Sequence, residues 1–348
     1  METQQDIAQE PHSSIKTDAA AEKASPEPAF SSNTASMVQA SNAFKRAASR
    51  VGAGVFVYVF SHMVLYLFSV SLANALNTVT HDAIDWYPIM RTLSIVIAAA
   101  LFAAVVKGMP KAQQVPQRVL DAQDYLSLLL SVIACAGLCV FPRVLRMAQR
   151  PYTFFFDEIL DFLFCSPPLA FALACVVLPL AQGVFLRGVL YKRLIQYGDK
   201  AFIIVGALAY GFCGLNIPNF FFNALIGCLL CWIMTRSGHV WLSILVHAIA
   251  NFLGLFIYSL AISAILPAPI SAMINLLCIV VLVPAGLVCI AICFAIMRTR
   301  FCAPIEYVPE KLFRTAIVNG GMLTGILTSA FIALVWMLLM QMIVGSRI

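Results

Sequence analysis

The chain has 348 residues, of which 61% are hydrophobic and 11% are charged, and its formal net charge is +6. Soluble domains carry about 25% charged residues, because their solvent-facing positions need polar groups. The composition therefore excludes an ordinary soluble protein and predicts an all-α bundle in a lipid bilayer. Most basic residues flank apolar segments instead of forming one patch, which argues against nucleic acid as a partner.

The first predicted region, residues 1–50, is a polar tail. Six acidic residues against Lys16 and Lys23 give residues 1–44 a net charge of −4, and Pro26 and Pro28 interrupt the segment. A segment of this kind does not bury enough apolar surface to fold. We therefore expect residues 1–50 to be disordered.

Apolar segments long enough to cross the hydrocarbon, which takes about 20 residues per helix, follow this tail. We predict a polytopic bundle of eight or nine spans, with N-terminal helices and an interfacial segment in 51–165, a core in 166–256 and C-terminal helices in 257–348. The candidate spans are Val51–Leu76, Ile89–Met109, Tyr125–Phe141, Pro168–Val189, Ala201–Leu215, Asn219–Met234, Val240–Leu266, Ile270–Met297 and Gly321–Val344. The fifth and sixth are short and predict a tight helical hairpin. Aromatic and acidic residues over 154–162 predict a short helix at the membrane interface.

Basic residues predict the orientation of these spans. Three of them between positions 45 and 50 place the N-terminus in the cytoplasm, and the loop Asn77–Tyr87, which lacks Lys and Arg, on the other side. Arg143, Arg146 and Arg150 then fall on the outer side. Either the third segment does not span, or the charge bias is overridden there.

Polar residues inside the predicted spans are few. All 16 carboxylates fall in the tail, the loops or the interfacial segment. This argues against proton-coupled pumps, which rely on buried carboxylates. The remaining candidates are His247 and Asn251, which lie one helical turn apart, together with Gln182 and Arg187 in the fourth span.

Three stretches resemble the motifs of the CAAX protease and bacteriocin-processing (CPBP) family. Val240–Asn251 is similar to the third motif, His-x-x-x-Asn, with His247 and Asn251 in place. Pro179–Leu190 is similar to the first motif, Glu-Glu-x-x-x-Arg-Gly, and ends in Arg187-Gly188. Ala207–Leu215 is similar to the second motif, Phe-x-x-x-His, with Tyr210 at the aromatic position. The order and spacing of the motifs agree over about a quarter of the chain, which implies a CAAX-protease-like helical core.

The chain departs from the motifs at three positions. Gln182 and Gly183 stand where the family has two glutamates, and Gly214 stands where it has the second-motif histidine. The resemblance implies that the first glutamate activates a water, and that His and Asn side chains orient it or hold the oxyanion. A glutamine amide cannot take a proton from water, and general-base catalysis contributes about 10²–10⁴-fold.

We therefore expect an inactive or catalytically impaired member that binds a hydrophobic or prenylated peptide, or another membrane protein. The alternatives are an active endopeptidase with a rearranged site, and a transporter or channel. The candidate site residues are His247, Asn251 and Arg187. No cofactor is expected; zinc would enter only in an active enzyme, and His247 is then the one motif candidate for a ligand, short of the usual three.

The depth of these residues in the membrane predicts a shared pocket. Gln182 lies about ten residues from Lys192, and His247 lies about eight from His239, at the same predicted cytoplasmic edge. A rise of 1.5 Å per residue places both side chains roughly 12–15 Å deep. The spread of the family favours a bacterial cytoplasmic membrane, with the endoplasmic reticulum as the eukaryotic alternative.

Overall fold

The structure is a computed structural model that describes residues 30–80, 86–112, 120–148, 167–213, 217–262, 267–299 and 312–345. Within these ranges all regular structure is helical, which confirms the all-α fold. Contacts divide the chain into Met1–Gln39 and Ala40–Ile348, and the packing described below lies within the second unit.

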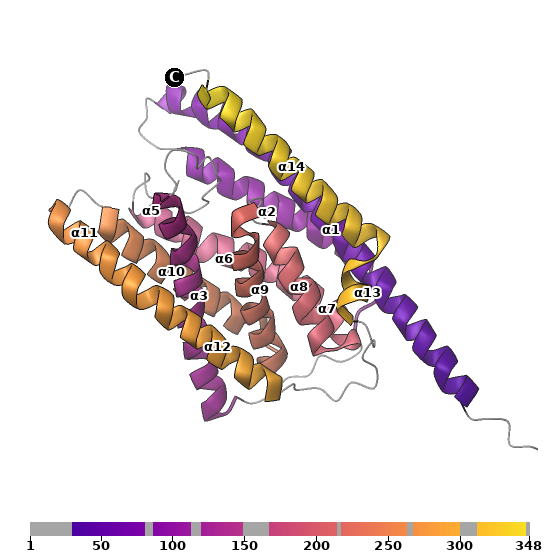
Figure 1. Cartoon of the computed structure of the whole chain (residues 1–348). Helices are drawn as coiled ribbons and strands as arrows, with labels where there is room; N and C mark the ends of the chain where they lie inside the picture. Colours follow the sequence, from indigo (N-terminus) through magenta and orange to yellow (C-terminus); the bar gives the residue numbers. More distant parts are fainter. Residues whose placement is uncertain are drawn as a thin grey trace, which may run out of the picture. The chain divides into compact units, whose positions relative to one another are not determined.

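The helices follow the predicted segments in order (Figure 1). They are α1 (Phe30–Thr80), α2 (Trp86–Lys107), α3 (Ala122–Ala148), α5 (Pro167–Phe171), η1 (Ala172–Val177), α6 (Leu178–Ala181), η2 (Gln182–Gly188), α7 (Val189–Leu194), η3 (Ile195–Tyr197), α8 (Asp199–Cys213), α9 (Ile217–Ser237), α10 (Val240–Ile262), α11 (Ala268–Leu277), η4 (Cys278–Leu282), α12 (Val283–Thr299), α13 (Leu312–Ile317) and α14 (Gly320–Gly345). The short helix α13 was not predicted, and residues 154–162 lie outside the described ranges.

Helix length and hydropathy support a multi-pass membrane protein. Among the described residues, five segments are long and apolar enough to cross a bilayer, and three shorter helices are also apolar. The long ones are Val38–Thr80, Trp86–Lys107, Ala122–Val140, Ala172–Tyr197 and Phe220–Ser237, and the shorter ones are Val240–Gly254, Val280–Ile296 and Gly320–Ile332. The remaining predicted span, Ala201–Leu215, is occupied by α8. The exact number of crossings stays a prediction.

The first helix begins earlier than predicted. It starts at Phe30 instead of Val51, so residues 30–50, which we expected to be disordered, are helical. Phe44, Ala47 and Ala48 are buried together with Val51. These positions recur at the spacing of one helix face, a pattern that the polar average composition of residues 1–44 concealed.

Helix α9 occupies the interior of the bundle. Residues 229–234 are all buried, which places neighbours on every side of the helix. It packs against α3, α8 and α10, and its extensive contact with α8 forms the predicted hairpin. The central position of α9 keeps α8 and α10, which carry Tyr210 and His247, close to each other.

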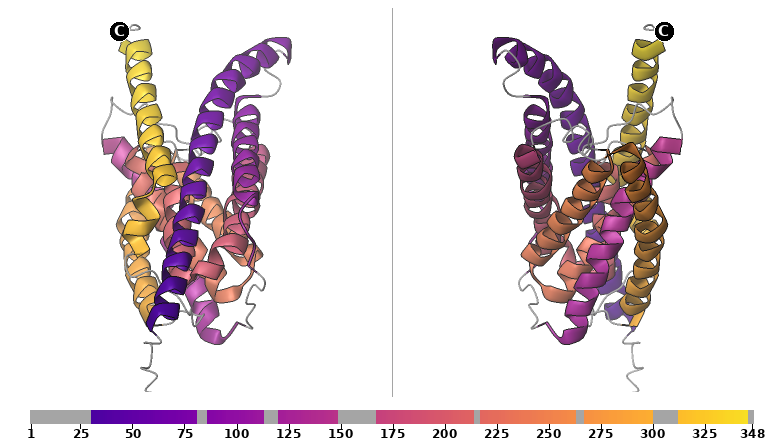
Figure 2. Two further views of the ribbon diagram at one scale, coloured as in Figure 1. Left: turned by 90° about the vertical axis from the view of Figure 1, so that its right-hand side faces the viewer. Right: turned by 90° about the vertical axis from the view of Figure 1, so that its left-hand side faces the viewer.

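Glycines allow α1 and α14 to touch backbone to backbone. A Cβ added at Gly52 would lie 2.3 Å from the Cα of Met322, and one at Gly325 would lie 2.4 Å from the Gly52 carbonyl oxygen. The two helices approach each other near the beginning of α14 (Figure 2). Gly321 and Gly325 have the GxxxG spacing that permits close helix packing in membranes. A first and a last helix are therefore joined by small residues.

Candidate functional site

A π-helical turn, η2, brings Gln182 and Arg187 to the same side of their helix. The backbone bond of a π-helix runs between residues five apart, so Gln182 and Arg187 lie one above the other. In an α-helix, with 3.6 residues per turn, they would be about 140° apart. Both side chains are buried. The local backbone geometry therefore assembles half of the site.

Tyr210 on α8 joins this half to His247 on α10. Its hydroxyl donates to Oε1 of Gln182 at 3.1 Å and lies 3.0 Å from Nε2 of His247. The two rings meet edge to face with centroids 5.9 Å apart. The prediction that Gln182 and His247 could meet is confirmed, since a single hydroxyl reaches both.

The hydrogen bonds of this network run in one direction. Tyr210 has a single proton, which it gives to Gln182, so it accepts the Nε2 proton of His247. The unprotonated Nδ1 of His247 then accepts from Nη2 of Arg187 at 3.4 Å. His247 is therefore neutral, and its basic nitrogen faces a cation. We call Arg187, His247, Tyr210 and Gln182 the polar network.

Arg187 is the charged member of the polar network. It is 1% exposed, and its Nε and Nη1 atoms have no hydrogen-bond partner in the described part of the chain. Its guanidinium carbon lies 5.5 Å from the centroid of the Tyr210 ring, close enough for a cation–π contact. All of these partners are neutral, so the network carries one net positive charge.

Gly183 marks a tight contact between η2 and α10. A Cβ added there would lie 2.2 Å from Cγ1 of Ile244 and 3.3 Å from Nη2 of Arg187. Ile244 therefore fills the volume in which a side chain at position 183 would begin. A glutamate at this position would require the Ile244 side chain to shift.

Asn251 lies one turn beyond His247 but binds elsewhere. Its Nδ2 donates to the backbone carbonyl oxygen of Ala174 in η1 at 2.9 Å, and the side chain is buried. The amide thus ties α10 to a second π-helical turn. Gly214, the remaining motif position, lies outside the described residues.

Sequence reasoning placed Tyr210 at an aromatic position and gave its hydroxyl no role. The structure makes this hydroxyl the centre of the polar network. The available signal was a tyrosine at the position where the motif has phenylalanine. A phenol differs from a phenyl ring by one group that donates and accepts, and such a group needs partners when buried.

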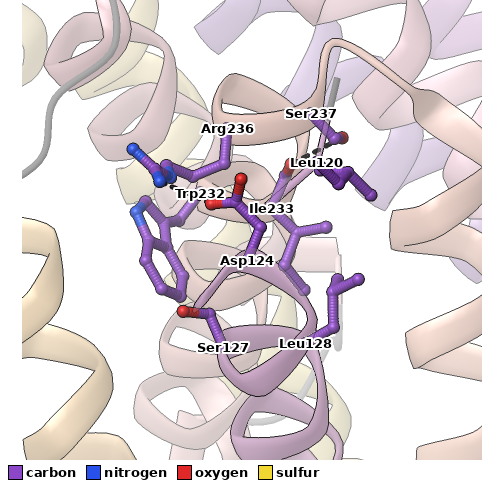
Figure 3. A pocket seen from close by; sticks show the side chains of 8 residues that line it. All are labelled: Leu120, Asp124, Ser127, Leu128, Trp232, Ile233, Arg236 and Ser237. Carbon is purple, nitrogen blue, oxygen red and sulfur yellow. Dashed lines mark hydrogen bonds and ion pairs between the residues drawn. The ribbon is translucent and has the colours of Figure 1, made fainter. Parts of the chain in front are cut away.

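A second buried polar cluster lies where α3 begins and α9 ends. Nη2 of Arg236 donates to Oδ1 of Asp124 at 2.5 Å, and both side chains are buried. Asp124 also caps α3, because it exchanges backbone-to-carboxylate hydrogen bonds with Asp121. Figure 3 shows the pair facing each other in a small pocket that Trp232 also lines. Sequence reasoning assigned Asp124 to a loop and did not predict this pair.

The residues of the polar network do not fit a catalytic zinc site. In the described part of the chain, no three His, Cys, Asp or Glu side chains come together as metal ligands would. His247 directs its two ring nitrogens to Arg187 and Tyr210. Catalytic zinc takes three protein ligands, and the polar network offers only His247.

The fold and the polar network define a multi-pass helical membrane protein with a buried polar site among apolar helices. Residues 164–253 match the family model described as Type II CAAX prenyl endopeptidase Rce1-like. The match confirms the resemblance and includes every member of the polar network. No curated protein and no solved structure matches the chain.

Proposed function

We propose that the protein is a catalytically impaired CAAX-protease-like membrane protein that binds a hydrophobic or lipidated peptide without cutting it efficiently. One observation carries the proposal: the polar network contains no group ready to take a proton from water. Gln182 is an amide, and the basic nitrogen of His247 is occupied by the cationic Arg187.

Chemistry supports this reading. Hydrolysis of a peptide bond needs a general base, worth about 10²–10⁴-fold, and a donor for the oxyanion, worth about 10²–10³-fold. Asn251, the amide that the motif offers for the oxyanion, already donates to the Ala174 carbonyl. The Ile244 side chain would have to shift before a second glutamate could stand at position 183. The contributions of the general base and of the oxyanion donor to the rate are thus both reduced, while the helical bundle is retained.

The location of the protein is proposed on the same basis. The apolar helices and the family match support a multi-pass membrane protein. The basic residues Lys45, Arg46 and Arg50 of α1 favour a cytoplasmic N-terminus. We propose a bacterial cytoplasmic membrane from the distribution of the family that the motifs resemble.

The test is proteolysis by the purified full-length protein in nanodiscs. Farnesylated and unmodified membrane peptides would be incubated with wild type, His247→Ala and Gln182→Glu, and the products identified by mass spectrometry. We expect wild type to leave the peptides intact while retaining labelled farnesylated peptide. Cleavage by wild type that His247→Ala abolishes would overturn the proposal in favour of an active, rearranged peptidase. Cleavage by Gln182→Glu alone would support it and identify the missing carboxylate as the cause.

A further inference from the structure

Arg187 holds a positive charge inside the bundle that no described residue neutralises. Its polar contacts are His247 and the face of Tyr210, both uncharged. An ion taken out of water without a counter-ion loses favourable solvation free energy, and ionisable residues buried in membrane helices are typically functional. A ligand of opposite charge would remove this cost.

We propose that Arg187 binds the carboxylate of an apolar ligand within the polar network. The inference rests on the proposed function and names the group by which the ligand is recognised. A guanidinium is suited to a carboxylate, because its planar N–H groups make charge-assisted hydrogen bonds with both oxygens. The Nε and Nη1 groups of Arg187 are buried and have no hydrogen-bond partner among the described residues. Either group can form a bidentate pair together with Nη2, whose present acceptor is Nδ1 of His247.

The surroundings of Arg187 define the rest of the ligand as apolar. Leu186 and Ile244 are buried beside it, and the thiols of Cys135 and Cys231 lie within electrostatic reach. On the same two helices, Val184 and Leu245 are exposed on the outside of the bundle. The apolar outer faces of these helices suit an apolar ligand that carries a carboxylate, such as a fatty acid or the C-terminus of a lipidated peptide.

Binding requires the network to open, because side chains cover both free N–H groups. The longest bond of the network, 3.4 Å between Arg187 and His247, is the one that a carboxylate would replace. Arg187 and Gln182 lie on a π-helical turn, a geometry often found at functional sites. The ligand carboxylate would thus take the place of His247 as the partner of Arg187.

The experiment compares acids with their neutral forms on the full-length protein in nanodiscs. The probes are palmitic acid against its methyl ester, and a farnesylated peptide with a free C-terminus against its amide. The readout is the shift in the thermal unfolding midpoint with probe concentration. We expect the acid of at least one pair to raise the midpoint and to bind at least tenfold more tightly than its neutral form.

Three variants test the role of Arg187. Arg187→Met removes the cation, and Gln182→Glu supplies an internal carboxylate of the same shape, so both should abolish the preference for the acid. Lys192→Met removes an exposed cation five residues away and should keep it. Gln182→Glu preserves the test should Arg187→Met fail to fold.

The outcomes separate the two proposals. The inference is supported if the protein prefers the acid form of palmitate, of the peptide, or of both. The preferred probe then identifies the source of the carboxylate. Equal binding of acid and neutral forms, no binding of any probe, or an acid preference that survives both variants overturns it. Cleavage of the peptide in the same samples overturns the proposed function instead.

Discussion

Arg187 and Arg236 are both buried in this bundle, and the protein treats them differently. Arg236, at the end of α9, forms an ion pair with Asp124 at the start of α3. Arg187, in η2, has a neutral histidine and a tyrosine ring as its partners. The first cation is neutralised within the protein and joins two helices, whereas the second keeps its charge in the family-matched segment. The comparison separates a charge that supports the fold from a charge that is free to act on a ligand.

The largest expected effect on stability comes from breaking the ion pair between Asp124 and Arg236. Asp124→Asn leaves Arg236 without its carboxylate, and breaking a buried pair costs about 3–5 kcal/mol of unfolding free energy. Asp121→Asn, which alters a half-buried carboxylate of the same cap, should cost much less. Unfolding in mixed detergent micelles measures both. Equal effects of the two substitutions would show that the cap, and not the ion pair, carries the stability.

Arg187→Met should stabilise the protein, in contrast to Asp124→Asn. Removing a buried charge that lacks a counter-ion, and replacing it with an apolar side chain, should raise the free energy of unfolding by about 1–4 kcal/mol. The gain in stability is smaller than the desolvation cost of the Arg187 charge, because Nδ1 of His247 loses its hydrogen-bond donor. The same unfolding assay applies. A loss as large as that of Asp124→Asn would mean that Arg187 is a structural residue like Arg236.

A third prediction concerns packing around the polar network. Gly183→Ala places a methyl group against Ile244 and should cost about 1–3 kcal/mol through overpacking. Gly320→Ala is the matched control, since a Cβ there meets nothing within 4 Å. Thermal unfolding of the two variants gives the difference. Equal stability would indicate that η2 and α10 separate easily at this point.

The smallest expected effect is that of Tyr210→Phe. It keeps the ring under Arg187 but removes the hydroxyl between Gln182 and His247. A net loss of about 0.5–1.5 kcal/mol per hydrogen bond is typical, so stability should fall modestly. An environment-sensitive signal, the ring-nitrogen NMR shifts of His247, should change as its Nε2 proton loses its acceptor. Unchanged shifts would contradict the direction of hydrogen bonding assigned here.

The sequence predicted the helical frame well because hydrocarbon imposes it. Ile89–Met109, for example, was predicted from apolar length alone and corresponds to α2, Trp86–Lys107. The start of α1 was missed, because Phe44 and Ala47 lie among polar residues and only their helical spacing reveals a buried face. Apolar length therefore predicts spans better than it predicts their extensions into the interface.

The candidate site was predicted in part. Spacing brought His247 and Gln182 to the same depth, and they do meet. The π-helical turn that aligns Arg187 with Gln182 leaves no signature in a pattern read at 3.6 residues per turn. The hydrogen-bond partner of Asn251 is the backbone carbonyl of Ala174, and every residue has such a group, so the sequence could not predict this bond.

The glycine contact between α1 and α14 has a consequence for biogenesis. Gly52 enters the membrane early in synthesis, whereas Met322 and Gly325, which cover it, are made about 270 residues later. At about 5–20 residues per second, α1 waits roughly 13–54 s for its partner. During this interval its small-residue face is open to other helices or to an insertase. Translation that stops before α14 would thus leave an unclosed bundle, which quality-control proteases can recognise by that face.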